Sequence, residues 1–200
     1  MEIVVCVKQV PDTTEVKIDP VKNTLIREGV PSIVNPFDKI AVEAALQLKE
    51  KYGGRVRVIS MGPPQAADAL KECLAMGAEE AVLVSDRAFG GADTLATAYA
   101  LSTSIEKMGT VDLILCGKQA IDGDTAQVGP GIAENLGWPQ ITYAAKIEVN
   151  GNTIKVDREH EDGYEIMETQ LPAIVTVVKS IAEPRFPTVK GTMKANRTQI

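Results

Sequence analysis

Short apolar runs alternate with longer stretches of helical periodicity from the start of the chain to about residue 140. The runs are rich in Val, Ile and Leu and lack regular polar alternation, which is typical of strands buried on both faces of a parallel sheet. Strands alternating with helices in this way indicate an α/β protein. We predict such strands at residues 3–7, 56–61, 81–85 and 111–116.

The segments between these strands carry helix start and stop signals. Asn35 precedes Pro36, and Asp38 follows in the first turn, which together indicate a helix start, while Gly53 indicates its end. The same rules predict further helices from about residue 65 to Gly77, from about residue 93 to Gly109, and from a cap at Thr125 to Gly137.

Strand patterns return in the second part of the chain. Residues 147–149 and 154–156 flank Asn150-Gly151 and predict a hairpin, followed by strands at 164–169 and 173–178. An earlier hairpin is predicted over 16–26. The expected fold class is therefore α/β, with a doubly wound, mostly parallel sheet and an added antiparallel hairpin region.

Composition narrows the class of protein. The 200 residues are 44% hydrophobic and 24% charged, which suits one globular domain with a sizeable core. No apolar run reaches the ~18 residues of a membrane span, and the first run is followed at once by Lys8 without signal-peptide organisation. We therefore expect a cytoplasmic protein without membrane insertion.

Reactive side chains are few. The three cysteines, at positions 6, 73 and 116, lack metal-ligand spacing and lie in apolar surroundings, so reduced, packed thiols are expected and no metal site. His160 sits among acidic residues in a predicted surface hairpin, where a catalytic role is not expected. No catalytic residue is assigned.

Charge is unevenly distributed along the chain. Residues 179–200 have a balance of +4, whereas the whole chain carries −6. This tail indicates either a docking element or a solvated terminus. It has no dense basic run and only one aromatic residue, Phe186, so nucleic acid is not an expected partner.

The segment 117–128 follows a buried strand and precedes a helix. Gly117 and Gly123 permit close backbone approach, and free N–H groups at a helix start attract phosphate. Asp122 and Asp124 would repel a triphosphate, and no Walker lysine-serine pair is present, so a nucleotide held as a fixture or a redox cofactor fits better than one that is hydrolysed. An ordinary βα turn is the alternative.

The segment 86–94 follows the third strand and belongs to the same rim of the sheet. Gly90 and Gly91 allow close backbone approach, Asp93 or Thr94 caps the next helix, and Thr97 adds a second hydroxyl to its first turn. The alternative is a flexible loop before a capped helix.

With these loops in place, the whole chain resembles the β subunit of electron transfer flavoproteins. The motifs that carry the resemblance are Val-Lys-Gln-Val-Pro-Asp at 7–12, Asn-Pro-Phe-Asp at 35–38, Met-Gly-Pro-Pro at 61–64, Ala-Met-Gly-Ala at 75–78, Gly-Lys-Gln-Ala-Ile-Asp-Gly-Asp at 117–124, Glu-Pro-Arg-Phe at 183–186 and Met-Lys-Ala at 193–195. The resemblance implies a sheet of the adenine-nucleotide-hydrolase-like type. An ATP-using enzyme of that fold would need a glycine-serine signature at the first βα turn, which residues 6–11 do not supply.

The resemblance also implies which residues form the nucleotide site. Ordinary family members hold a structural AMP, and the matching residues here are Cys6, Asn35, Pro36, Phe37, Asp38, Met61, Gly117, Lys118, Gln119, Ala120, Ile121, Asp122, Gly123, Asp124, Thr125, Ala126, Gln127 and Val128. The family's recognition loop, which docks a partner dehydrogenase, corresponds to about residues 177–199. It contains Arg185, Phe186 and Lys190, with Val189 at the position of an aliphatic anchor.

Two segments resemble the electron-bifurcating, nitrogen-fixation-linked branch, namely residues 86–94 and 125–130. In that branch the β subunit holds a second FAD in place of AMP. NADH reduces it, one electron goes to a low-potential acceptor such as ferredoxin or flavodoxin, and the other goes to the FAD of the α subunit and on to an acyl-CoA dehydrogenase. The resemblance then adds Gly90, Gly91, Asp93, Thr94 and Thr97 to the site, with the two threonines beside the flavin. The alternative is a simple shuttle that holds AMP and passes electrons from dehydrogenases to a quinone reductase.

The resemblance finally divides the chain into a nucleotide-binding domain, residues 1–180, and a recognition loop, residues 181–200. Family members continue into an arm that wraps the α subunit, so this chain is expected to be a fragment that ends at the start of the arm.

Overall fold

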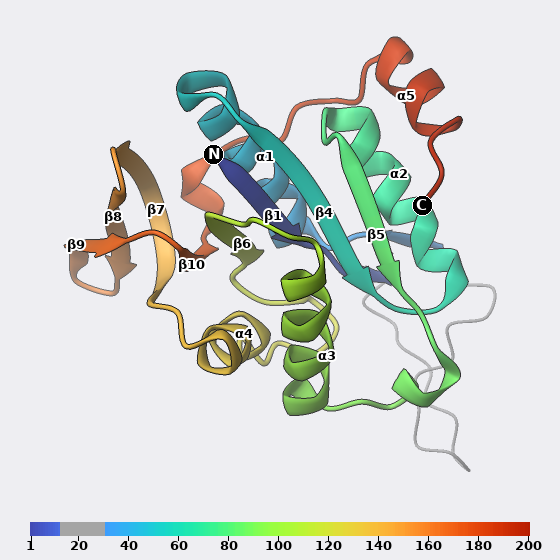
Figure 1. Cartoon of the computed structure of the whole chain (residues 1–200), viewed down its shortest axis with the longest axis horizontal. Helices are drawn as coiled ribbons and strands as arrows, with labels where there is room; N and C mark the ends of the chain where they lie inside the picture. The colour runs from blue at the N-terminus through green and yellow to red at the C-terminus, as the bar shows by residue number, and fades with distance from the viewer. Residues whose placement is uncertain (13–30) are drawn as a thin grey trace.

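The computed structural model describes residues 1–12 and 31–200, and the predicted hairpin over 16–26 lies outside the described residues. An eight-stranded sheet runs through the middle of the molecule (Figure 1), in the order β5-β4-β1-β6-β10-β7-β8-β9. Neighbouring strands from β5 through β4, β1, β6 and β10 to β7 pair in parallel. Strands β8 and β9 are antiparallel additions at the β7 edge. The strands are β1 (Glu2–Cys6), β4 (Arg55–Met61), β5 (Glu80–Val84), β6 (Leu113–Gly117), β7 (Gln140–Asn150), β8 (Thr153–His160), β9 (Gly163–Gln170) and β10 (Ala173–Val177).

Helices cover both faces of the parallel part. Helices α1 (Pro36–Tyr52) and α2 (Ala67–Met76) pack on one face, and α3 (Thr94–Lys107) and α4 (Val128–Leu136) pack on the other. This is the doubly wound α/β fold that the sequence predicts, so the expected fold class is confirmed. The remaining elements are a small antiparallel pair, β2 (Gln9–Pro11) with β3 (Ser32–Val34), the 3-10 turns η1 (Pro64–Ala66), η2 (Arg87–Phe89) and η3 (Lys179–Ile181), and helix α5 (Val189–Ala195).

Alternate residues of each central strand serve two separate cores. In β1, Ile3 and Val5 face α1 and α2, whereas Val4 and Cys6 face α3 and α4. Burial on both faces explains why these strands are continuous apolar runs in the sequence. All three cysteines are free and buried, as predicted.

The N-terminal cap predicted at Thr125 is wrong. Helix α4 begins at Val128, with Gln127 at the cap position. The backbone of Asp124 and of Ala126 has positive φ, 50° and 54°, so the chain takes two left-handed steps before it can enter a right-handed helix. Thr125 is exposed in this irregular loop. Of the two residues predicted to cap α3, Asp93 is the one found, because its carboxylate accepts the N–H of Ala96 at 2.8 Å.

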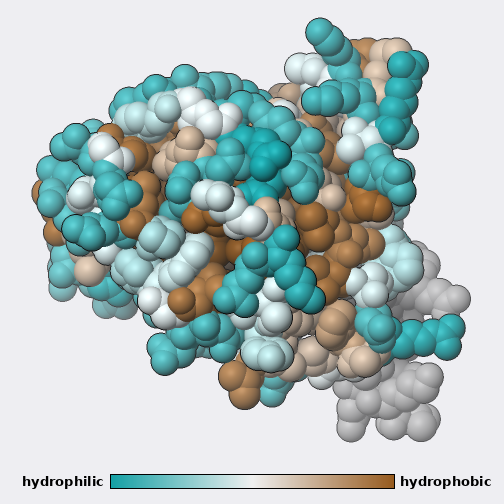
Figure 2. All heavy atoms as spheres, viewed as in Figure 1, coloured by the Kyte–Doolittle hydropathy of each residue, from teal (hydrophilic) through white to brown (hydrophobic). Residues whose placement is uncertain are grey.

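One part of the sheet surface is apolar and uncovered by a helix. Figure 2 shows hydrophobic residues over β4 and β5, beside α3. Met61, Val82 and Val84 are only partly buried there. Exposed apolar patches of this kind are typical of interaction surfaces.

Candidate nucleotide site

The chain order of the sheet reverses between β1 and β6. From β1 the chain runs to β4 on one side, whereas β6 is followed by elements on the other side. The two strands lie in parallel register, with Cys6 opposite Cys116, and end together at Cys6 and Gly117. In doubly wound sheets ligands bind beyond the carboxyl ends of the strands at such a switch point. The loops that follow these two strands are therefore the candidate site.

Polar contacts hold the first half of the loop after β6 against neighbouring segments. The Lys8 ammonium lies 2.6 Å from an Asp122 carboxylate oxygen, whose side chain is only 5% exposed. The Asn35 side chain, itself fully buried, donates to Gln119 O at 2.8 Å and accepts the N–H of Ile121 at 3.1 Å. The loop is thus anchored to both the β1 end and the start of α1. Lys8 was not among the predicted site residues, although it belongs to the family motif at residues 7–12.

The second half of the loop has backbone N–H groups that are not hydrogen-bonded within the described part of the chain. Asp124 accepts a hydrogen bond from the Gln119 side chain at 2.8 Å, and its own N–H bonds to Ala120 O. Within residues 1–12 and 31–200, the N–H groups of residues 125–129 have no hydrogen-bond partner. Successive free N–H groups around left-handed residues, at the start of a helix, attract an anion such as phosphate.

Asp38 joins three segments beneath this loop. Its carboxylate accepts the backbone N–H of Lys8 at 2.8 Å and is also hydrogen-bonded by the Asn35 side chain and by the backbone of Gly117. Burial raises the pKa of the Asp38 carboxyl to about 7, although these hydrogen bonds and the nearby Lys8 charge lower it. Asp38 is therefore a buried structural acceptor that titrates near neutral pH.

Gly117 has a packing role that differs from the one expected. A Cβ atom at this position would come within 2.7 Å of the Asp38 nitrogen and 2.6 Å of the Phe37 carbonyl carbon. The absence of a side chain thus lets α1 approach the end of β6. The predicted approach of a ligand to Gly117 stays a prediction, whereas the close approach of the first turn of α1 is a feature of the fold.

The predicted loop after β5 leads into α3, which packs against α4. The N-terminal halves of α3 and α4 are in contact, because a Cβ at Gly131 would lie 2.8 Å from the Ala98 methyl group. Gly91 has φ of 81°, which favours glycine, and the exposed Asp93 caps α3. Thr94 and Thr97 are half-buried in the first turn, and neither hydroxyl bonds to any residue that the structure describes.

Sequence reasoning named Lys118 as a site residue but missed Tyr143 and Arg158, which form an aromatic and basic cluster with it. The Tyr143 ring has the Lys118 ammonium 5.1 Å and the Arg158 guanidinium 6.0 Å from its centroid. Tyr143 has φ of 62° and lies at an irregularity of β7, where its N–H bonds to the Thr176 hydroxyl at 3.0 Å. No local signal in the sequence joins Lys118 to Tyr143 and Arg158, since the three come from different strands or loops.

The remaining predicted residues lie at the end of β4 and in the segment after η3. Met61 ends β4 and lines a small cavity of about 30 Å³ with Lys8 and Gln65, which has room for a water molecule only. The predicted docking residues 185–190 lie near α1 and α2, on the opposite face of the sheet from α3 and α4.

Among the described residues, no group of three His, Cys, Asp or Glu side chains is arranged to hold a metal ion. No helix in the described part of the chain is long and apolar enough to cross a membrane.

The fold and this loop define a doubly wound α/β protein with a candidate nucleotide site at its switch point. A family model for the electron transfer flavoprotein domain matches residues 22–200. The electron transfer flavoprotein β subunit of Megasphaera elsdenii is 60% identical over the whole of this chain and 77% of its own length. The chain therefore belongs to the β subunits of electron transfer flavoproteins, as its motifs indicate.

Two other relatives concern the predicted resemblance to the electron-bifurcating, nitrogen-fixation-linked branch of the family. The subunit CarD of the caffeyl-CoA reductase-Etf complex of Acetobacterium woodii is 58% identical over 98% of this chain and 75% of its own length. Protein FixA of Azotobacter vinelandii is 49% identical over all of this chain and 73% of its own length. Electron transfer with an α subunit is the function class that these similarities establish, and the predicted resemblance to this branch is confirmed.

Proposed function

We propose that this chain binds FAD at the switch point and works, with an α subunit, as the subunit that receives electrons from NADH. The carrying observation is the run of partner-free N–H groups at residues 125–129, in a loop that Lys8 and Asn35 hold in place. These groups suit the pyrophosphate of a dinucleotide. Asn35 and Cys6 would lie toward the adenosine.

Two further features favour FAD over AMP. The hydroxyls of Thr94 and Thr97 belong to the first turn of α3, and the next residue, Ala98, lies against Gly131 of α4. They would extend the polar site beyond the phosphates, where AMP has no atoms and FAD has its isoalloxazine ring. The positive φ of Gly91 and the cap at Asp93 give this side of the site a defined backbone.

The cofactor supplies the redox chemistry when bound, since a flavin accepts a hydride and can release electrons one at a time. The residues of this chain bind and orient it. The backbone N–H groups of the loop would oppose the phosphate charge, and the Lys8 ammonium would offset the charge of Asp122. Asp124 keeps its negative charge, because its partner is the neutral side-chain amide of Gln119.

The proposed donor and acceptors follow from the branch of the family. CarD belongs to a complex with a caffeyl-CoA reductase, which supports an acyl-CoA dehydrogenase as one partner of this chain. A ferredoxin or flavodoxin is the proposed low-potential acceptor, and the α-subunit FAD the other. All of these reactions are proposed in the cytoplasm.

The experiment is to co-express the chain with its α subunit, purify the complex and identify the released nucleotides. We expect two FAD per heterodimer and direct reduction by NADH. One FAD and one AMP, without reduction by NADH, would instead support the simple AMP-holding shuttle. The double variant Thr94→Val/Thr97→Val should lower flavin occupancy or shift its potential, at about 1 kcal/mol per lost hydrogen bond. Thr103→Val, farther along α3, is the matched control because its hydroxyl bonds only within the helix, to Tyr99 O.

A further inference from the structure

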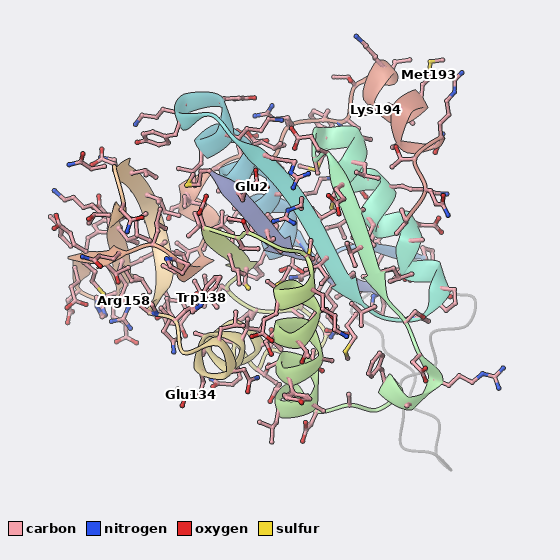
Figure 3. The ribbon with its side chains drawn as sticks, in the orientation of Figure 1. Glu2, Glu134, Trp138, Arg158, Met193 and Lys194 are labelled. Atoms are coloured by element: carbon pink, nitrogen blue, oxygen red, sulfur yellow. The ribbon has the colours of Figure 1, made fainter. Side chains whose placement is uncertain are left out.

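The segment after η3 presents large apolar side chains to solvent. Phe186 is 91% exposed, Val189 81% and Met193 56%. In Figure 3, Met193 and Lys194 lie on α5 at the outer edge of the molecule. We call Phe186, Val189 and Met193 the apolar docking face. An exposed anchor binds more tightly when its backbone is already held in the binding geometry, because less conformational entropy is lost on binding.

Helix α5 is held against α2 by close packing. A Cβ at Gly191 would overlap the backbone carbonyl of Ala75, and Ala195 is buried in the core on the α1 and α2 face. This contact fixes the C-terminal part of the segment. It leaves open what holds the part that carries Phe186.

Arg185 provides the second attachment, on α1. Its Nε and Nη2 donate to the two carboxylate oxygens of Glu43 at 2.7 and 2.9 Å, and its Nη1 donates to Glu50 at 2.6 Å. Its backbone N–H also donates to Glu43, at 3.2 Å. This fork-to-carboxylate geometry fixes both the side chain and the main chain immediately before Phe186.

Burial makes this ion pair more than a surface contact. The Glu43 side chain is 4% exposed, whereas that of Arg185 is 34% exposed. Burial alone would raise the pKa of Glu43, but hydrogen bonds from Arg185 and Gln47 lower it below its usual range. Removal of Arg185 would leave a buried carboxylate without its counter-charge, which is costly.

We propose that Arg185 is a positioning residue, which latches the segment 183–188 to α1 and so orients the apolar docking face for its partner. Arg185 then acts through Glu43 and Glu50 and does not itself contact the dehydrogenase. The partner meets Phe186 and Val189, together with Lys190 and Lys194. The inference rests on the proposed docking function of this segment.

The test uses the assembled α–β complex and two measurements. Hydrogen exchange of residues 186–198 reports the latch, and the KM and kcat for electron delivery to the acyl-CoA dehydrogenase report docking. Arg185→Gln should speed exchange and raise KM roughly tenfold, with kcat at saturation unchanged. Glu43→Gln, which alters only the α1 side of the latch, should do the same.

Each outcome decides the question. Unchanged exchange in both Arg185→Gln and Glu43→Gln would overturn the latch. A KM that rises in Arg185→Gln but not in Glu43→Gln would also overturn it, because Arg185 would then contact the dehydrogenase directly. Lys190→Gln is the charge-matched control and should leave exchange unchanged. Val189→Asp tests docking separately, because a wild-type KM in that variant refutes the docking function while the exchange measurement still tests the latch.

Discussion

The Asp38 carboxylate accepts the backbone N–H of Lys8 at 2.8 Å and so joins the first turn of α1 to the chain leaving β1. Asp38 is 7% exposed, and its carboxyl also lies against Gly117 at the end of β6. The residue therefore helps to set the spacing of the two strand ends between which a nucleotide would lie. Because it is a buried acid, its ionisation should appear in the stability of the protein.

Asp38 should make stability decrease as pH rises toward neutrality. Its folded pKa of about 7 exceeds its ordinary value of 3.8, so between these values the folded state keeps a proton that the unfolded state has lost. The contribution is complete below the lower value and is lost as pH rises through the upper one, at about 1.4 kcal/mol per pH unit. Unfolding of wild type and Asp38→Asn across this range measures the difference between the two. Parallel curves would contradict the prediction.

Gly117→Ala should destabilise the protein by about 1–3 kcal/mol, because the new methyl group would overlap the backbone of Phe37 and Asp38. Gly123→Ala is the matched control, since a Cβ there has no atom within 4 Å. Its effect should stay within about 0.5 kcal/mol. Thermal or urea unfolding of both variants makes the comparison. Equal effects would mean that the contact with α1 does not require glycine at position 117.

The isolated chain should be less stable and more prone to aggregate than the α–β complex. The apolar surface over β4 and β5, with Met61, Val82 and Val84 partly exposed, would be left uncovered in the single chain. Binding of a partner to the folded state alone raises its apparent stability. Light scattering and melting temperature, with and without the α subunit, provide the measurement. A monodisperse single chain with the same melting temperature in both conditions would contradict the prediction.

Val189→Asp should slow electron delivery to the dehydrogenase and leave the nucleotide content unchanged. The side chain is 81% exposed on α5, and α5 lies near α2, on the opposite face from α3 and α4. Loss of a buried anchor in an interface costs roughly 2 kcal/mol or more, whereas loss of a rim charge acts mainly on the association rate and its salt dependence. Lys194→Gln should therefore give a smaller effect that shrinks in high salt. Stopped-flow rates over a salt series distinguish the two variants, and wild-type rates in both would exclude docking through α5.

Much of the architecture follows from local sequence alone. The apolar runs of β1, β4, β5 and β6, the start of α1 at Asn35-Pro36 and the cap at Asp93 each depend on a few neighbouring residues, and all are found in the structure. The rule that strand ends share one rim then brings residues 35–38 and 117–128 together without any knowledge of contacts. The motifs for the family also lie in these loops, which is why the class of protein could be inferred.

Tertiary structure decided what depends on distant partners. The cap at Thr125 failed because left-handed residues 124 and 126, within a loop anchored by Lys8 and Asn35, delay helix α4. The extent of β7, from residue 140, depends on its pairing with β10 as well as β8, and η3 and α5 were not foreseen. Arg185 reads as a free positive charge in the sequence, yet it pairs with Glu43 across 142 positions. Periodicity and capping act over one or two turns, whereas an ion pair or a strand order is set only when the whole chain has packed.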